Sequence, residues 1–291
     1  MSLRFCRQGG LCGKLGAHFP GGLTLREPRT VLITGGASGL GLALAREAGR
    51  RGYRVAMADV DEARGEEARR GLQEQNVEAL FCRCDVRREQ DLRQAVQRVI
   101  RRWGRLDLMV NNAGVAAAGP FEAIPADDWE WLMDINLMGV VRGCRVAVPE
   151  MKRQGGGHIV NIASMAGLTP PPGMSLYNVS KAGVVSLSES LHSELAPLDI
   201  RVTLVCPSFF RTNLGNSLRT PDPVSSARFE RLLENNDVTA EMIAVDILDA
   251  VDRKRFLVLP HRPARKAWRQ KRWFPKRFFT AMEELVRKIR R

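Results

Sequence analysis

Long apolar stretches are missing from this sequence: no segment reaches the roughly 18 apolar residues that a membrane-spanning helix needs. The six cysteines include no CxxC pair, and Cys82-Arg83-Cys84 has the wrong spacing for a metal knuckle or a redox pair. The four histidines show no metal-ligand spacing, and the Gly-x-Ser-x-Gly elbow of serine hydrolases is absent. No secretory signal precedes the cysteines, which favours reduced thiols and a cytoplasmic protein. We therefore expect no metal site and no serine-hydrolase chemistry.

Acidic residues are scarce at both ends of the chain, and this imbalance produces the net charge of +13. Residues 264–291 hold eleven Lys or Arg against two Glu, residues 1–29 hold five against one Glu, and the remainder is neutral overall. The length of 291 residues and the 44% hydrophobic content suit one large folded domain. The predicted organisation is a leader over 1–28, a folded domain over 29–263 and a basic amphipathic tail over 264–291. The leader loosely resembles a mitochondrial presequence, but its glycines disfavour a targeting helix, so disorder is the preferred interpretation.

Short apolar runs alternate with longer helical patterns through the body of the chain. The predicted strands are Thr30–Thr34, Tyr53–Ala58, Val77–Cys82, Leu106–Val110, His158–Ile162, Ile200–Val205 and Phe256–Leu259. The predicted helices cover 40–51, 61–74, 88–102, 128–153 (with Asp127 as its cap), 175–196 and 239–252. Strands separated by helices require crossover connections, which predict an α/β fold with a doubly wound parallel sheet in three layers. No internal repeat or mid-chain linker divides this single domain.

A glycine-rich loop follows the first predicted strand and opens a helix. Its residues Thr34, Gly35, Ser38, Gly39, Leu40 and Gly41 are candidate cofactor-binding positions. Glycines here let the backbone approach a pyrophosphate and direct a helix N-terminus at its charge. Asp59 ends the second strand, where a carboxylate accepts hydrogen bonds from ribose hydroxyls and repels a 2′-phosphate. Because Ser38 adds no positive charge to the loop, we predict NAD in preference to NADP.

Further motifs follow in order, and together they resemble the short-chain dehydrogenase/reductase family, a Rossmann-fold family, over about residues 30–260. The matching positions are the TGxxxGxG loop, Asp85 and Val86, Asn111-Asn112-Ala113-Gly114, Asn136, Ser164 thirteen residues before Tyr177, the YxxxK motif ending at Lys181, and Pro207 with Thr212. The resemblance implies that Asp85 contacts the adenine ring and that Asn136 holds a water linked to Lys181. It also implies that Asn112, Ala113, Gly114, Pro207 and Thr212 help to bind the cofactor. Ser208 departs from the pattern, because glycine is usual at that position.

The chemistry of the candidate catalytic set can be argued from its side chains. Tyr177 and Lys181 are four residues apart and share a helix face. A free phenol has a pKa near ~10, and a nearby ammonium together with an oxidised nicotinamide favours its ionised form. Tyr177 would then exchange a proton with a substrate oxygen that Ser164 holds by a hydrogen bond. We expect an NAD(P)-dependent oxidoreductase; the alternative is a catalytically silent NAD(P)-binding regulatory or scaffold protein.

Two regions carry expectations about partners. Leu168, Pro170–Pro172, Met174, Phe209, Phe210 and Leu214 form either an apolar substrate wall or ordinary loop packing. An apolar wall would suit a hydrophobic secondary alcohol or ketone, such as a steroid, retinoid or lipid-derived compound. In the tail, Phe278, Met282, Leu285 and Ile289 fall on one helical face among basic residues. That face fits packing on the body or a sister subunit, or an anionic membrane surface with peripheral attachment, while nucleic acid is the least favoured partner. The family resemblance further implies a homodimer or homotetramer paired through the helices near 128–153 and 177–196.

Overall fold

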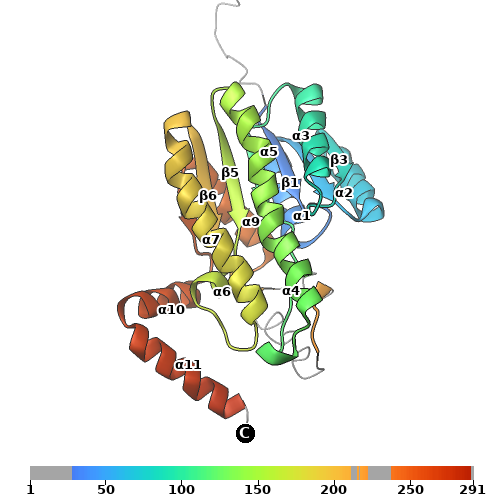
Figure 1. The fold of residues 1–291 in the computed structure, drawn as a ribbon. Coiled ribbons are helices and arrows are strands. Elements are labelled where there is room, and N and C mark those ends of the chain that lie inside the picture. Colours follow the sequence, from blue (N-terminus) through green and yellow to red (C-terminus); the bar gives the residue numbers. More distant parts are fainter. Residues whose placement is uncertain (1–27, 211–214, 216, 222–236, 290–291) are drawn as a thin grey trace, which may run out of the picture.

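The computed structural model describes residues 28–210, 215, 217–221 and 237–289 of the chain. The expectations for the leader 1–27, for Thr212 and for Leu214 lie outside these residues. The predicted doubly wound α/β fold is confirmed: parallel strands form one sheet with helices on both faces (Figure 1). The C-terminal region is helical, also as expected.

The sheet contains seven parallel strands in the order β3-β2-β1-β4-β5-β6-β7. Their bounds are β1 Thr30–Thr34, β2 Arg54–Asp59, β3 Ala79–Arg83, β4 Leu108–Asn111, β5 Gly157–Ile162, β6 Ile200–Val205 and β7 Leu257–Val258. Strand order reverses between β1 and β4, which pair through Val31 with Leu108 and Ile33 with Val110. In a doubly wound sheet, ligands bind beyond the carboxyl ends of the strands at such a switch point.

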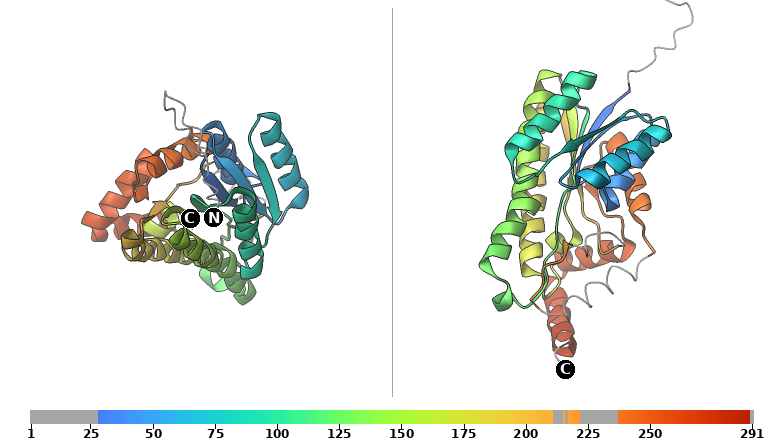
Figure 2. Two further views of the ribbon diagram at one scale, coloured as in Figure 1. Left: turned by 90° about the horizontal axis from the view of Figure 1, so that it is seen from above. Right: turned by 90° about the vertical axis from the view of Figure 1, so that its right-hand side faces the viewer.

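Two helical layers cover the sheet, because both faces of its apolar strands must be removed from water. One layer contains α1 Gly39–Arg50, α2 Glu62–Glu74 and α9 Ala240–Asp252, whose apolar side chains pack with Val31, Ile33 and Val55 of the sheet. The other contains α3 Glu89–Trp103, α5 Gly139–Arg153 and α7 Ser175–Leu195, which enclose Leu32, Met109 and Ile159. Figures 1 and 2 show these layers on opposite sides of the sheet.

The single long helix predicted over 128–153 is interrupted in the structure. It consists of α4 Ala126–Met133, the π-helical turn η2 Asp134–Met138 and then α5. The prediction that Asp127 caps this helix is wrong, because α4 begins at Ala126 directly after Pro125 and places Asp127 in its first turn. Short π-helical turns within helices often mark functional positions, and this one contains Asn136.

Three helical elements lie near the carboxyl edge of the sheet. The short helix α6, Met165–Leu168, begins directly after Ser164 and was not predicted from the sequence. At the C-terminus, α10 Arg262–Trp273 packs beside α6, and α11 Pro275–Ile289 extends away from the body (Figure 1). No helix within the described ranges is long and apolar enough to cross a membrane.

Candidate active site

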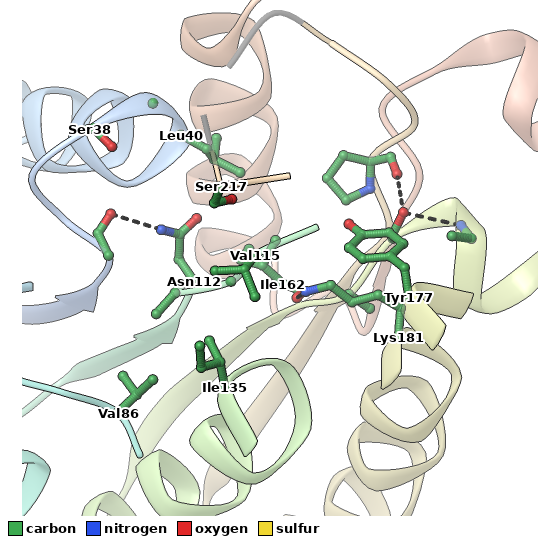
Figure 3. Close-up of a pocket in the computed structure, with 18 of the residues that line it drawn as sticks. Ser38, Leu40, Val86, Asn112, Val115, Ile135, Ile162, Tyr177, Lys181 and Ser217 are labelled. Atoms are coloured by element: carbon green, nitrogen blue, oxygen red, sulfur yellow. Dashed lines mark hydrogen bonds between the residues drawn. The ribbon is translucent and has the colours of Figure 1, made fainter. Parts of the chain in front are cut away.

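A cavity of about 630 Å³ opens at the carboxyl edge of the sheet, at the switch point between β1 and β4. Its lining joins the glycine loop, the carboxyl ends of β2, β3, β4 and β5, and helix α7. Figure 3 shows Ser38 and Leu40 on one side of the cavity and Tyr177 with Lys181 on the other. Most of the sequence-predicted cofactor and catalytic positions therefore face a common space; of those that the structure describes, Thr34, Gly41 and Asn136 do not line it.

The glycine loop is held tightly against the end of β4. The Thr34 hydroxyl accepts hydrogen bonds from the backbone N–H groups of Asn112 at 2.9 Å and Ala113 at 3.1 Å. The Asn112 side chain donates to the carbonyl oxygens of Thr34 at 2.9 Å and Gly35 at 3.1 Å. These contacts give Thr34, Asn112 and Ala113 a structural part in shaping the loop.

Two loop positions require glycine for different reasons. Gly35 has a φ of +62°, in the left-handed region that glycine adopts at no steric cost. At Gly41 a Cβ atom would lie 2.0 Å from the Gly35 carbonyl oxygen, so any side chain would displace the loop. The next helix, α1, has neither a side-chain hydrogen bond at its N-cap Ser38 nor an acidic residue in its first turn. Its first N–H groups and its positive dipole end thus suit an anionic ligand such as a pyrophosphate.

Beside the glycine loop, the cavity lining combines two carboxylates with two cations. Asp59 accepts a hydrogen bond from Ala37 N at 3.0 Å, which ties the end of β2 to the glycine loop. Asp85 is engaged by the Arg87 guanidinium at 2.6 Å, and this contact lowers the pKa of the carboxyl group. Arg64 and Arg87 both line the cavity beside these acids. Neither arginine was predicted from the sequence, where only position 38 was weighed as a source of positive charge.

Tyr177 and Lys181 project from α7 into the cavity wall, as their four-residue spacing predicts (Figure 3). Lys181 Nζ donates to the carbonyl oxygen of Ile162 at 3.0 Å and lies 5.8 Å from the centre of the Tyr177 ring. Both side chains are buried in the folded chain. The pair is therefore fixed at the carboxyl end of β5 and faces the same space as the glycine loop.

Ser164 joins this pair from the end of β5. It is the N-cap of α6, where its hydroxyl accepts a hydrogen bond from Ala166 N at 3.1 Å, and it also lies 3.4 Å from the Pro207 carbonyl oxygen. Pro207 in turn accepts from Met165 N at 2.8 Å, and Ser208 N donates to His261 Nδ1 at 3.2 Å. The segment after β6 is thus tied to the serine and to the residue that precedes α10.

Asn136 is fully buried on the π-helical turn, and its side chain is bound to the backbone of Val115. Asn136 Oδ1 accepts from Val115 N at 2.8 Å, and Nδ2 donates to Val115 O at 2.9 Å. Between this amide and the lysine lies Gly114, where a Cβ atom would be 3.2 Å from Asn136 Oδ1 and 3.5 Å from Lys181 Nζ. The missing side chain at position 114 leaves space beside both polar groups.

Burial dominates the acid–base properties of the pair. It raises the pKa of Tyr177 to about 12, and the neighbouring Ser164 hydroxyl acts in the opposite direction. Burial also lowers the pKa of Lys181 to about 8. The pKa of Tyr177 is therefore raised overall, and the lowering by Lys181 that the sequence suggested stays a prediction. A further positive charge in the cavity is needed before the phenol ionises easily.

Part of the cavity lining is apolar. Pro171, Phe209 and Phe210 belong to it, as the sequence suggested. Leu168, Pro170, Pro172 and Met174 are not among the lining residues, and Met174 instead packs in the core beneath Tyr177. Trp131 on α4 and Ile135 on the π-helical turn also face the cavity and were not predicted from the sequence.

The remaining reactive residue types have structural surroundings. The described cysteines 82, 84, 144 and 206 are free and buried, and burial raises the pKa of the Cys144 and Cys206 thiols to about 12. His158 contacts the Thr203 hydroxyl at 2.8 Å, and burial lowers its pKa to about 4. Within the described part of the chain, no group of three or more His, Cys, Asp or Glu could hold a metal ion.

A glycine loop at the switch point of a parallel sheet, facing a buried tyrosine and lysine, defines the class of nucleotide-dependent α/β oxidoreductases. Residues 29–223 match the family model described as short chain dehydrogenase. The chain belongs to the short-chain dehydrogenase/reductase family, as its motifs indicated.

Individual relatives agree with this assignment. A CLA biosynthesis dehydrogenase/reductase of Lactiplantibacillus plantarum is 32% identical over 253 residues, which cover 81% of this chain and 88% of the relative. A 2-(R)-hydroxypropyl-CoM dehydrogenase of Xanthobacter autotrophicus is 38% identical over 188 residues, covering 63% and 75% respectively. The crystal structure of a short chain dehydrogenase/reductase from Burkholderia phymatum in complex with NAD has a TM-score of 0.82 at 30% identity, with 84% of this chain and 93% of that chain covered.

Proposed function

We propose that this protein transfers a hydride between a nicotinamide cofactor and an alcohol/carbonyl pair, with Tyr177 as the acid/base. The observation that carries the proposal is the convergence of Tyr177, Lys181 and Ser164 on one wall of the cavity that the glycine loop borders. Each of these residues comes from the end of a strand or from a long helix, so its position is fixed by the core.

The roles of the catalytic residues follow from their chemistry. The Tyr177 phenol takes the proton of an alcohol during oxidation, or returns it to the oxygen during reduction of a carbonyl group. The Ser164 hydroxyl donates a hydrogen bond to the same oxygen and stabilises its developing charge. Lys181 supplies positive charge to the buried phenol and a donor to the cofactor ribose. Asn136 and Gly114 maintain the space beside Lys181 Nζ through which a water reaches the lysine.

The residues around the glycine loop fit the cofactor. When bound, an oxidised nicotinamide dinucleotide supplies the hydride acceptor and a positive charge that favours the ionised phenol. The α1 N-terminus with Gly35, Ser38, Gly39, Leu40 and Gly41 would hold its pyrophosphate, and Asp59, Asp85 and Val86 would hold the adenosine. Asn112, Ala113, Gly114, Pro207 and Thr212 complete the proposed set; Thr212 lies outside the described residues.

We predict a preference for NAD that depends on Asp59. Its carboxylate lies at the adenosine end of the cavity, where it would repel a 2′-phosphate, although Arg64 and Arg87 oppose this effect. Asp59→Asn should therefore raise the ratio of kcat/KM for NADP to that for NAD by about tenfold or more. Steady-state kinetics with both cofactors measure the ratio. Glu74→Gln, which removes an exposed charge at the far end of α2 and outside the cavity lining, is the control, and equal ratios in both variants would end the proposal.

The substrate class is proposed from the apolar part of the cavity lining, which includes Trp131, Phe209 and Phe210. Such a wall favours hydrophobic secondary alcohols or ketones of steroid, retinoid or lipid-derived type. Initial rates should be recorded at the absorbance of the reduced cofactor, with NAD and NADP, for apolar alcohols and ketones against small polyols. We expect turnover of apolar compounds; faster turnover of polyols would contradict the substrate class, and absence of any turnover would favour a silent cofactor-binding protein.

We also infer a homodimer or homotetramer formed through α5 and α7. Val179 on α7 and Met138 just before α5 expose apolar side chains, which such pairing would cover. Light scattering should give a multiple of the 32.4 kDa chain mass, and a monomer mass at micromolar concentration would contradict the inference.

A further inference from the structure

The C-terminal arm, defined as residues 262–289 with helices α10 and α11, is built differently from the body of the protein. Helix α10 packs beside α6, whereas α11 packs on α10 and on no other described element to a comparable extent. Both Figure 1 and Figure 2 show α11 extending beyond the end of the molecule. Most of α11 is thus not needed to complete the core.

The arm exposes large apolar side chains that a helix in water would normally cover. Trp273 is 72% exposed, Phe274 is 57% exposed and Phe279 is 48% exposed, all at or near the junction of the two helices. Along α11, the predicted apolar stripe starts at Phe278, which is buried, but Leu285 further along is 39% exposed. Within its described side chains, the stripe is thus more exposed at Leu285 than at Phe278, where α11 meets α10.

The same arm carries most of the net positive charge of the chain. Residues 264–291 contain eleven Lys or Arg against Glu283 and Glu284, while residues 30–263 are neutral overall. Arg269, Lys276 and Arg277 are exposed around the aromatic junction. Two such arms would repel each other, which disfavours a second copy of the chain as the occupant of this surface.

Basic residues around exposed Trp and Phe are the combination that a helix lying in an anionic membrane surface uses. The aromatic rings enter the interfacial region, and the cations remain at the level of the lipid phosphates. Single-stranded nucleic acid favours a basic groove with stacking platforms, whereas this arm is a projecting helix. Charge and shape together select an anionic bilayer.

The arm is also fixed relative to the cavity. Lys271 Nζ donates to the Leu168 carbonyl oxygen at 2.6 Å, at the end of the short helix that Ser164 begins. His261, directly before α10, accepts from Ser208 N at the cavity lining. A membrane bound by the arm would consequently lie at the carboxyl edge of the sheet, on the side where the cavity opens.

We propose that the C-terminal arm docks this protein onto anionic lipid bilayers, through the aromatic residues 273, 274 and 279 and the surrounding lysines and arginines. The docking is independent of the proposed enzymatic activity, because it is measured without turnover. Binding should require anionic lipid and should weaken as salt concentration rises.

The test is co-sedimentation of the full chain with vesicles of phosphatidylcholine alone and of phosphatidylcholine mixed with phosphatidylglycerol. The wild-type chain should bind the mixed vesicles only. Lys276→Gln with Arg277→Gln should reduce the partition coefficient roughly thirtyfold, since each cation contributes about 1 kcal/mol at such a surface. Trp273→Ala with Phe274→Ala should reduce it at least about tenfold.

The matched control is Arg70→Gln with Arg101→Gln, which removes two exposed cations from α2 and α3. It should bind like the wild-type chain, because only charges beside the aromatic junction touch the membrane. Equal losses in the control and arm variants, or equal binding to both kinds of vesicle, would overturn the proposal. So would tighter binding to a single-stranded oligonucleotide than to vesicles, or a loss of self-association in the arm variants without lipid.

Discussion

Tyr177→Phe should lower kcat at least about a thousandfold, because the substitution removes the hydroxyl group that exchanges a proton with the substrate oxygen, and phenylalanine has no group that can take over this role. The phenyl ring preserves the packing of this buried side chain in the α7 wall, so the fold and the cofactor-binding residues should remain in place. The measurement is the rate of change in reduced-cofactor absorbance with the best substrate of the panel.

The other tyrosine of the chain provides a matched control. Tyr53 is also buried, and burial raises the pKa of its phenol to about 12, but it lies at the start of β2 and does not line the cavity. Tyr53→Phe should leave kcat within about twofold, and both variants should bind cofactor with nearly wild-type affinity by titration. Turnover of Tyr177→Phe above a tenth of the wild-type rate would remove Tyr177 from the proposed role.

Lys181→Met should lower turnover at least about a hundredfold and at the same time raise the free energy of unfolding at neutral pH. The loss of turnover follows because the buried phenol loses its neighbouring positive charge. The gain in stability follows from the buried ammonium: its pKa falls from 10.5 to about 8, which costs the folded state about 3 kcal/mol below pH 8. The variant also loses the hydrogen bond to Ile162, which offsets part of this stabilisation. We therefore expect the free energy of unfolding to rise by about 1–2 kcal/mol in total.

The pH dependence of this effect has a definite sign. Between pH 8 and pH 10.5 the unfolded lysine still holds a proton that the folded lysine has released, so wild-type stability from this group rises with pH. The advantage of Lys181→Met should therefore shrink from pH 7 to pH 10 in chemical denaturation experiments. Lys152→Met on the exposed surface of α5 serves as the control and should show neither effect. If Lys181→Met were less stable than wild type across this whole pH range, the buried ammonium would not destabilise the folded state, and the prediction would be wrong.

Much of the fold could be predicted because its signals are local. The predominantly apolar runs TVLIT and IRVTLV coincide with β1 and β6, since strands buried on both faces are rich in apolar residues. Observed strand ends differ from predicted ones where the end of a strand depends on contacts with neighbouring elements. Strand β3 runs from Ala79 to Arg83, whereas Val77 to Cys82 was predicted. The interruption at Asp134–Met138 was not predicted, because a π-helical turn has the same apolar composition as the helices that it joins.

The predicted site was better defined near the motifs than away from them. Tyr177, Lys181 and Ser164 converge because spacing on α7 and the end of β5 determine their direction. The positions of Trp131, Arg64 and Arg87 on the cavity wall depend on tertiary packing between distant segments, which sequence spacing does not encode. The contact between Lys271 and Leu168 likewise depends on tertiary packing, because 103 residues of sequence separate the two.

The most direct test of the central claim follows the hydride itself. The wild-type protein would be incubated with an apolar ketone and reduced cofactor carrying deuterium at both nicotinamide C4 positions, and the alcohol analysed by mass spectrometry. The proposed chemistry predicts one deuterium at the carbinol carbon of the product and at least about a thousandfold slower product formation by Tyr177→Phe. An alcohol without deuterium, or equal product from the variant, would contradict it.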